Sequence, residues 1–293
     1  MPRSFDLSVV LAEAIENPEV GPALEAIERS CTGIATEVLV VRPKGRPVLP
    51  HSAALTLREV TADERTLVPE RWGLGVHAAQ APVFACLTTE LVVHPDWARA
   101  LLHALASGAS GAGGAIALGP RAGITATAVY LARFSAFLSR PSGEPSIADN
   151  IPGDAAAYRR DAVLAFPDLL ADGFWEAEFH ARFRARGSRL VFIDQPLSSF
   201  RSSVRLRSAL VLRARHGYGF GVTRVLRHYD SPVRMLIVAP AVPVMLISRI
   251  VGRAVRAPGK MWLVVKVLPA LALLCAAWAY GEGVGAWASR SRR

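Results

Sequence analysis

Residues 7–41 read LSVVLAEAIENPEVGPALEAIERSCTGIATEVLVV, and this stretch decides the fold. Residues 7–11 and 37–41 are short apolar runs rich in β-branched side chains, which are typical of strands buried in a parallel sheet. Between them, residues 16–19 (ENPE) predict the start of a helix. The apolar residues that follow at helical spacing are Ala23, Leu24 and Ile27. A strand, a helix and a second strand in this order predict a right-handed βαβ unit.

The alternation of strands and helices continues along the chain. Two more strands are expected at residues 55–60 and 83–87, and HPDW at residues 94–97 predicts the start of another helix, with its proline near the first turn. The Gly/Ala/Ser stretch at residues 107–114 is expected to be a flexible connection before a strand at residues 115–118. The pattern predicts an α/β fold with a mostly parallel sheet flanked by helices.

Polar residues follow two of the expected strands. Arg42 comes at the end of the second strand, and Thr88, Thr89 and Glu90 come at the end of the strand at residues 83–87. Because ligands in such sheets bind beyond the carboxyl ends of the strands, we expect a binding site at this edge.

Longer motifs extend the pattern to residue 183. The segments are FDLSVVL at residues 5–11, EVLVV at 37–41, VFACLTTELVVHPDW at 83–97, IPGDAAAYRR at 151–160 and FWEAEFHARF at 174–183. In this order they resemble the motifs of bacterial family-2 glycosyltransferases of the GT-A fold. A C-terminal segment like AWAYGEGVG, residues 277–285 of this chain, also recurs in membrane-associated members of that family. The resemblance implies a GT-A-like domain over residues 1–200.

The resemblance also implies a nucleotide-sugar donor and a divalent metal, Mn²⁺ or Mg²⁺. The donor-binding residues would be Arg42, Thr88, Thr89 and Glu90. Arg42 stands where the family has an aspartate that contacts the nucleoside, and an arginine pairs instead with phosphate. Thr88 and Thr89 replace acids of the family's Asp-x-Asp motif, which leaves Glu90 as the one carboxylate for a metal. The motif is therefore degenerate, and a metal-independent mechanism stays open.

The general base is better preserved, although Asp154 stands where the family's acceptor segment has an asparagine. By position, Glu176 falls on the acid that deprotonates the acceptor hydroxyl in the family, the role of a general base. The residues expected to bind the acceptor are Asp154, Tyr158, Arg159, Arg160 and Trp175. Each candidate also has a purely structural interpretation: the threonines satisfy nearby backbone groups, Asp154 forms a turn after Pro152-Gly153, and Glu176 is a solvated helical glutamate.

The charge and hydropathy of the chain are concentrated in its C-terminal part. Residues 201–293 contain 16 Lys or Arg and only two acids, whereas residues 1–200 contain 18 basic and 22 acidic side chains. Two long apolar runs lie among these cations. Anionic lipid headgroups attract such cations, and neighbouring apolar side chains enter the acyl region. Nucleic acid would instead require basic residues interleaved with polar and stacking groups, so we expect anionic membrane lipids as the partner.

The C-terminal part divides into two expected segments. Residues 201–232 predict a basic amphipathic helix and a linker, and residues 233–293 predict apolar membrane-associated helices. The apolar runs at residues 235–247 and 267–280 contain prolines and fall short of the ~20 residues of a full span. Two interpretations stay open: an interfacial or re-entrant pair, which we prefer, or a shallow helical hairpin.

Together these features predict a function. The N-terminal sequence shows no signal peptide, and three widely spaced cysteines favour a reducing compartment. We therefore expect a glycosyltransferase acting on a lipid-linked or polysaccharide acceptor at the cytoplasmic side of the bacterial inner membrane. The alternative is a catalytically degenerate relative that serves as a membrane-bound binding or scaffold partner.

Overall fold

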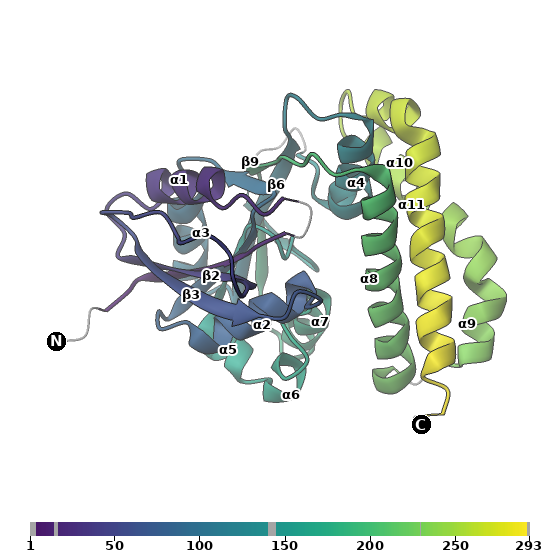
Figure 1. Cartoon of the computed structure of the whole chain (residues 1–293), viewed down its shortest axis with the longest axis horizontal. Helices are drawn as coiled ribbons and strands as arrows, with labels where there is room; N and C mark the ends of the chain where they lie inside the picture. The colour runs from purple at the N-terminus through teal and green to yellow at the C-terminus, as the bar shows by residue number, and fades with distance from the viewer. Residues whose placement is uncertain (1–3, 15–16, 140–144, 229, 292–293) are drawn as a thin grey trace. The chain divides into compact units, whose positions relative to one another are not determined.

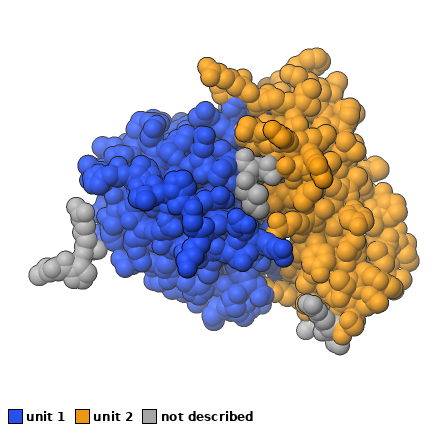
Figure 2. All heavy atoms as spheres, viewed as in Figure 1, with its two compact units in different colours: residues 1–119, 139–201 blue, residues 120–138, 202–293 orange. Residues whose placement is uncertain are grey.

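A computed structural model describes residues 4–14, 17–139, 145–228 and 230–291 of the 293-residue chain. The chain forms two compact units (Figure 2). Unit 1 contains residues 1–119 and 139–201, and unit 2 contains residues 120–138 and 202–293. Residues 120–138 therefore belong with the C-terminal helices, although they lie within the expected N-terminal domain in sequence.

The βαβ unit forms as the sequence predicts. Strand β1 (Leu7–Ala12) and strand β2 (Thr36–Pro43) are parallel, with Val9 opposite Val38, and both are buried along their whole length. Helix α1 (Gly21–Ser30) joins them and buries Ala23, Leu24 and Ile27. It begins at Gly21, later than the expected start at residues 16–19, of which Glu16 lies outside the described residues. Pro22 occupies the first turn, where its missing N–H costs no hydrogen bond.

Two further strands complete a parallel half of the sheet. Strand β3 (Thr56–Ala62) pairs with β2, and strand β4 (Val83–Thr88) pairs with β1. Helix α2 (Val68–Ala78) covers β1, β2 and β3 on the side opposite α1 (Figure 1). In the ladder, Ala12 lies opposite both Val41 and Thr88, so the carboxyl ends of β1, β2 and β4 share one edge.

The rest of the sheet is mixed. The strand order is β3-β2-β1-β4-β8-β6-β9-β5, and β7 (Pro145–Ala148) pairs with β9. Strand β8 (Ala156–Arg159) is antiparallel to both β4 and β6 (Gly111–Leu118). Strand β9 (Leu190–Phe200) is parallel to β6 and antiparallel to β5 (Leu91–Val93). The longer ladders are the parallel ones, and the α/β class is confirmed.

The stretch at residues 107–114 corrects one expectation. Residues 111–114 are part of β6 rather than a flexible connection. A Cβ atom on Gly111 would lie 2.7 Å from the ring of Tyr158, and one on Gly114 would lie 2.6 Å from the side chain of Leu197. The glycines are present because large neighbours approach the strand closely, and this steric reason is invisible to a local sequence pattern.

Four further helices lie in the described part of unit 1. Helix α3 (Trp97–Ala106) begins as HPDW predicts and packs against α1, where the Ala98 amide donates to the Ser30 hydroxyl. The others are α5 (Arg160–Leu164), α6 (Pro167–Leu170) and α7 (Glu176–Ala185). An aromatic cluster anchors α7 to the sheet, since the rings of Phe84, Phe174 and Phe179 pack together at centroid distances near 5 Å.

Unit 2 is helical. It consists of α4 (Ile124–Phe134), η1 (Ser135–Phe137), α8 (Leu206–Arg227), α9 (Pro232–Val238), η2 (Ala239–Ala241), α10 (Val242–Val255) and α11 (Met261–Ala288). Helices α8 and α11 lie side by side and run in the same direction (Figure 1). A Cβ atom on Gly281 would lie 1.9 Å from the Ala214 carbonyl oxygen, so the two backbones touch. Two apolar segments, Pro232–Val255 and Met261–Ala288, are long enough to cross a membrane.

Candidate functional site

Two of the expected site residues meet at the carboxyl end of β4. Thr88 is the last residue of this strand, and Asp154 lies in the loop that leads into β8. The Thr88 hydroxyl donates to Asp154 Oδ2 over 3.4 Å, a long hydrogen bond between two buried side chains. The two residues are 66 positions apart in sequence, and the antiparallel pairing of β4 with β8 brings them together.

The loop that carries Asp154 is held in an unusual backbone conformation. Ala155 has a φ of 59°, in the left-handed region that non-glycine residues rarely adopt. Its N–H donates to the Cys86 carbonyl over 2.8 Å, and its carbonyl accepts from the indole of Trp97 over 2.8 Å. Such strained residues concentrate at functional sites, where the surrounding structure keeps them in place. These hydrogen bonds hold the backbone that directly follows Asp154.

Glu176 reaches the same loop from the start of α7. Its carboxylate packs on Gly153, where a Cβ atom would lie 2.7 Å from Glu176 Cδ and 3.0 Å from Oε2. Gly173, three residues earlier, has a φ of 105° and lies against the backbone of Glu70 in α2. The next residue, Phe174, donates its N–H to the Pro69 carbonyl over 2.7 Å. These contacts with α2 set the position at which α7 begins.

The pKa values of two buried side chains agree with the convergence of Asp154 and Glu176 on the loop before β8. Burial raises the pKa of the Cys86 thiol, and the nearby carboxylates of Asp154 and Glu176 raise it further. Burial also raises the pKa of Tyr158, with Glu176 as its strongest charged neighbour. Two carboxylates therefore act on one small region behind the end of β4. The candidate active site consists of Thr88, Asp154 and Glu176. We call these three residues the carboxylate cluster.

Thr89 organises the loop after β1. Its hydroxyl accepts from the Ala14 N–H over 2.8 Å and donates to the carbonyl of Asn17, whose side-chain amide in turn donates to the Thr89 carbonyl over 2.9 Å. These bonds match the structural interpretation of Thr89 and tie the loop after β1 to the end of β4. A contact of Thr89 with a donor remains a prediction.

A residue that sequence reasoning missed secures the same edge. Arg71 of α2 is fully buried, and its guanidinium donates to the carbonyls of Glu13, Asp63 and Glu64. It thereby joins the loops that follow β1 and β3. A single arginine inside an amphipathic helix carries no local signal for such a role, because its partners are backbone carbonyls from distant segments.

Arg42 and Glu90 lie at the same edge of the sheet with different surroundings. Arg42 is buried at the end of β2, where its guanidinium forms an ion pair with Glu59 of β3. A donor phosphate would have to compete with this carboxylate. Glu90 is also buried, in the turn between β4 and β5, and its carbonyl accepts from the Arg201 N–H over 2.7 Å.

The structure corrects the expectation that Tyr158, Arg159 and Arg160 form one acceptor surface. Tyr158 is fully buried, with its ring against Phe84 and its hydroxyl 3.0 Å from His180 Nε2. It is a packing residue because β8 turns this position into the aromatic core.

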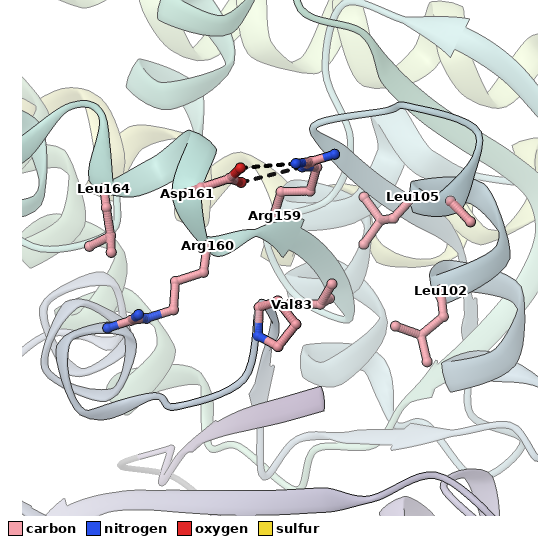
Figure 3. Close-up of a pocket in the computed structure, with 9 residues that line it drawn as sticks. Val83, Leu102, Leu105, Arg159, Arg160, Asp161 and Leu164 are labelled. Carbon is pink, nitrogen blue, oxygen red and sulfur yellow. Dashed lines mark hydrogen bonds and ion pairs between the residues drawn. The ribbon is translucent and has the colours of Figure 1, made fainter. Parts of the chain in front are cut away.

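The two arginines lie at the opposite end of β4 from Thr88. Arg159 pairs with Asp161 over 2.9 Å, and the Arg160 N–H donates to the Pro82 carbonyl. Both line a pocket of about 520 Å³ whose apolar wall includes Val83 (Figure 3). Val83 and Thr88 are the first and last of the six residues of β4, so five residue steps of about 3.3 Å place them about 17 Å apart.

Trp175 stays close to the carboxylate cluster. It directly precedes Glu176, is partly exposed, and donates its indole N–H to the Asp172 carbonyl over 3.0 Å. This bond restrains the indole at the start of α7, and a role for Trp175 as a wall for an acceptor sugar remains a prediction.

The side chains at this edge do not fit a metal site built by the protein. Mg²⁺ and Mn²⁺ prefer several charged oxygen ligands. Within the four described ranges, no group of three or more His, Cys, Asp or Glu side chains is placed to hold one ion. The hydroxyls of Thr88 and Thr89 are engaged with Asp154 and with the loop after β1. A metal bound by Glu90 would take most of its ligands from the donor and water.

Comparison with known proteins gives similarity at the level of solved structures. No protein-family model and no curated protein match the sequence. The chain is similar to residues 1–349 of TarS from S. aureus in complex with UDP, with a TM-score of 0.47 and 9% identity over 98% of this chain and 92% of that one. The same part of TarS in complex with UDP-GlcNAc gives 0.47 and 9% over 94% and 92%.

A third solved structure is a mannosyltransferase. PcManGT from Pyrobaculum calidifontis, in complex with GDP-Man and Mn²⁺, has a TM-score of 0.46 and 15% identity. The similarity covers 99% of this chain and 76% of that one. All three solved structures hold a nucleotide or a nucleotide sugar.

Proposed function

We propose that this protein transfers a sugar from a nucleotide-sugar donor to a lipid-linked or polysaccharide acceptor. One observation carries the proposal. The motifs that contain Thr88, Asp154 and Glu176 are widely separated in sequence, and their side chains converge at the carboxyl edge of the parallel strands. This is the edge at which α/β sheets bind ligands, and it holds the carboxylates that acid–base chemistry needs.

Glu176 is the proposed general base. Its carboxylate is partly exposed, so an acceptor hydroxyl can reach it, whereas Asp154 is buried. In a single displacement, Glu176 takes the hydroxyl proton while the acceptor oxygen forms a bond to the anomeric carbon of the donor sugar. The bond from that carbon to the diphosphate oxygen breaks, and the nucleoside diphosphate leaves with the electron pair. Asp154 and Trp175 are proposed to orient the acceptor beside Glu176.

The donor is proposed to bind over the ends of β1, β2 and β4. The loop after β1, held by Thr89 and Arg71, provides the floor of this site. Arg42 is the proposed partner of a donor phosphate, in exchange for its contact with Glu59. Glu90 is the proposed ligand of Mn²⁺ or Mg²⁺ if the transfer uses a metal, and no step of the displacement above depends on it.

Unit 2 supports a location at the cytoplasmic face of the bacterial inner membrane. Its two apolar segments and its excess of cations suit an anionic lipid surface. An acceptor built on a lipid, or a polysaccharide made at the membrane, would explain why a nucleotide-sugar enzyme carries such helices.

The test is donor binding by the detergent-purified full chain. A panel of UDP-, GDP- and dTDP-sugars is titrated with and without Mn²⁺ or Mg²⁺, and hydrolysis of each donor is followed. Saturable binding of one donor that is weakened in Arg42→Gln, a variant shown to be folded, supports the proposal. Metal-dependent binding would assign Glu90 to the site, and metal-independent binding would favour Arg42. Absence of binding across the panel would contradict the proposal.

The second candidate function is binding without catalysis. It is favoured by one specific observation: Thr88 and Thr89 occupy positions where the resembled family has acids, and the Thr89 hydroxyl both donates and accepts a hydrogen bond within the protein. A protein that binds a donor or glycan but shows no turnover under any metal condition would fit this alternative.

A further inference from the structure

We infer that neither apolar helical segment crosses the membrane, and that both lie in the cytoplasmic interface of an anionic bilayer with the turn between them on the cytoplasmic side. The inference rests on the membrane attachment in the proposed function and assigns it a topology. Length alone does not decide the question, because Pro232–Val255 and Met261–Ala288 each exceed the ~20 residues of a span.

The apolar side chains of both segments are largely exposed. Only 11% of the most apolar window of Pro232–Val255 and 33% of that of Met261–Ala288 is buried within the protein. On α11 the exposed side chains recur at helical spacing and include Trp262, Val265, Leu273, Tyr280, Val284 and Trp287. An exposed apolar face of this size requires a partner, and lipid suits a stripe that has a tryptophan near each end.

Cations stand at every connection of these segments. Arg224 and Arg227 precede the first segment, Arg256 and Lys260 lie in the turn between the two, and Arg290 follows the second. Basic connections stay on the cytoplasmic side of a membrane. With the start, the turn and the end all on the same side, neither segment can cross the bilayer.

The packing of α11 on α8 gives an independent argument. The two helices run parallel in backbone contact, since Cβ atoms on Gly217 and Gly221 would lie 2.3 Å and 2.2 Å from the carbonyl oxygens of Trp278 and Glu282. Arg224 of α8 forms an ion pair with Glu282 over 2.6 Å. The C-terminal half of α11 is therefore fixed along an arginine-rich helix over several turns.

A spanning α11 would carry these arginines into the bilayer. The guanidinium of Arg213 lies 4.4 Å from the ring centroid of Trp278. Trp278 is about 5 Å beyond the midpoint of α11, at a rise of 1.5 Å per residue. Arg213 would thus lie near the centre of the hydrocarbon layer, where an arginine disfavours insertion by roughly 100-fold. An interfacial α11 leaves its exposed stripe in the lipid and α8 in contact with water and headgroups.

The topology can be tested with single cysteines in the full chain. The native cysteines, Cys31, Cys86 and Cys275, are buried and make wild type the labelling blank. Pro258→Cys reports the turn, Ser291→Cys reports the C-terminal end, and the exposed Ala181→Cys in unit 1 is the cytoplasmic control. A membrane-impermeant maleimide is applied to right-side-out spheroplasts and to inverted membrane vesicles.

The inference predicts that all three cysteines are labelled at least tenfold more in inverted vesicles than in spheroplasts. Labelling of Pro258→Cys from outside, with Ala181→Cys protected, would overturn it in favour of a hairpin that spans. Labelling of Ser291→Cys alone from outside would overturn it in favour of a spanning α11. Recovery of the protein in the soluble fraction would overturn the inference and, separately, the proposed membrane attachment.

Discussion

The carboxylate of Glu176 packs directly on the backbone of Gly153, so closely that a Cβ atom at position 153 would lie 2.7 Å from Glu176 Cδ. Gly153 precedes Asp154, so this contact couples the two acidic residues of the carboxylate cluster. The absence of a side chain at position 153 therefore gives Glu176 its place beside the loop before β8.

Gly153→Ala is expected to displace the Glu176 carboxylate. The clash is with the end of a flexible side chain, so the fold can accommodate it at a small cost in stability. A general base moved by about 1 Å loses on the order of 100-fold in rate. We expect kcat for donor hydrolysis or transfer to fall by that factor with the thermal midpoint nearly unchanged. Gly21→Ala is the matched control, because a Cβ atom there meets nothing within 4 Å.

Thr88 and Thr89 are expected to respond differently to loss of the hydroxyl. Thr89→Val removes two backbone hydrogen bonds in the loop after β1 and should lower the free energy of unfolding by about 1–3 kcal/mol. Thr88→Val removes one long bond to Asp154 and should weaken donor or acceptor binding with a stability change below about 1 kcal/mol. Denaturant unfolding and ligand titration of both variants separate the two roles. Equal loss of stability in both would contradict this assignment.

His180 is expected to make stability depend on pH. Burial, with a smaller effect of Arg184, lowers its folded pKa to about 3 from the usual 6.5. The unfolded chain therefore binds a proton below pH 6.5 that the folded chain does not, and stability falls as the pH drops from 6.5 towards 3. At pH 5 the loss attributable to this residue is about 2 kcal/mol relative to pH 8.

The measurement for His180 is a difference between two proteins. Unfolding of wild type and of His180→Gln is followed from pH 8 to pH 5. Glutamine is chosen because its side chain can still accept a hydrogen bond from the Tyr158 hydroxyl. The variant should show the smaller loss of stability at acid pH. Parallel pH profiles would assign the acid sensitivity to other groups.

The exposed cations at the end of the first apolar segment and in the turn after it are expected to contribute electrostatic affinity for lipid. Arg249 and Arg256 are exposed, and each cation near an anionic surface contributes about 1 kcal/mol. Arg249→Gln combined with Arg256→Gln should weaken partition onto vesicles that contain anionic lipid by roughly 30-fold and leave partition onto neutral vesicles unchanged. Removal of the exposed cations Arg29 and Arg99 from unit 1 is the matched control.

The sequence allowed much of the fold to be predicted, because its strongest signals are local. Strands β1, β2, β3 and β4 lie within a few residues of their expected positions, and α3 begins where HPDW places it. The second half of β6 was predicted at residues 115–118, but its first half was missed, because its glycines are required by the close approach of Tyr158 and Leu197 from elsewhere in the chain. Helix α4 was missed too, and its association with the C-terminal helices is a matter of tertiary packing.

The candidate site was likewise predicted in part from the sequence. The motif resemblance singled out Thr88, Asp154 and Glu176, and the structure brings them together. It could not reveal that Tyr158 faces the aromatic core, because one position in a strand decides which face its side chain takes. The roles of Arg71 and Trp97 rest on hydrogen bonds to distant backbone carbonyls, for which the sequence holds no local pattern.

The central claim is that Glu176 acts as the base of a glycosyl transfer, and its most direct test is turnover of the nucleotide-sugar donor by Glu176→Gln. Glu178→Gln is the matched control, since Glu178 lies in the same first turn of α7. The account predicts that Glu176→Gln binds donor normally and loses at least 100-fold in kcat, while Glu178→Gln keeps wild-type turnover. Wild-type turnover by Glu176→Gln would contradict it.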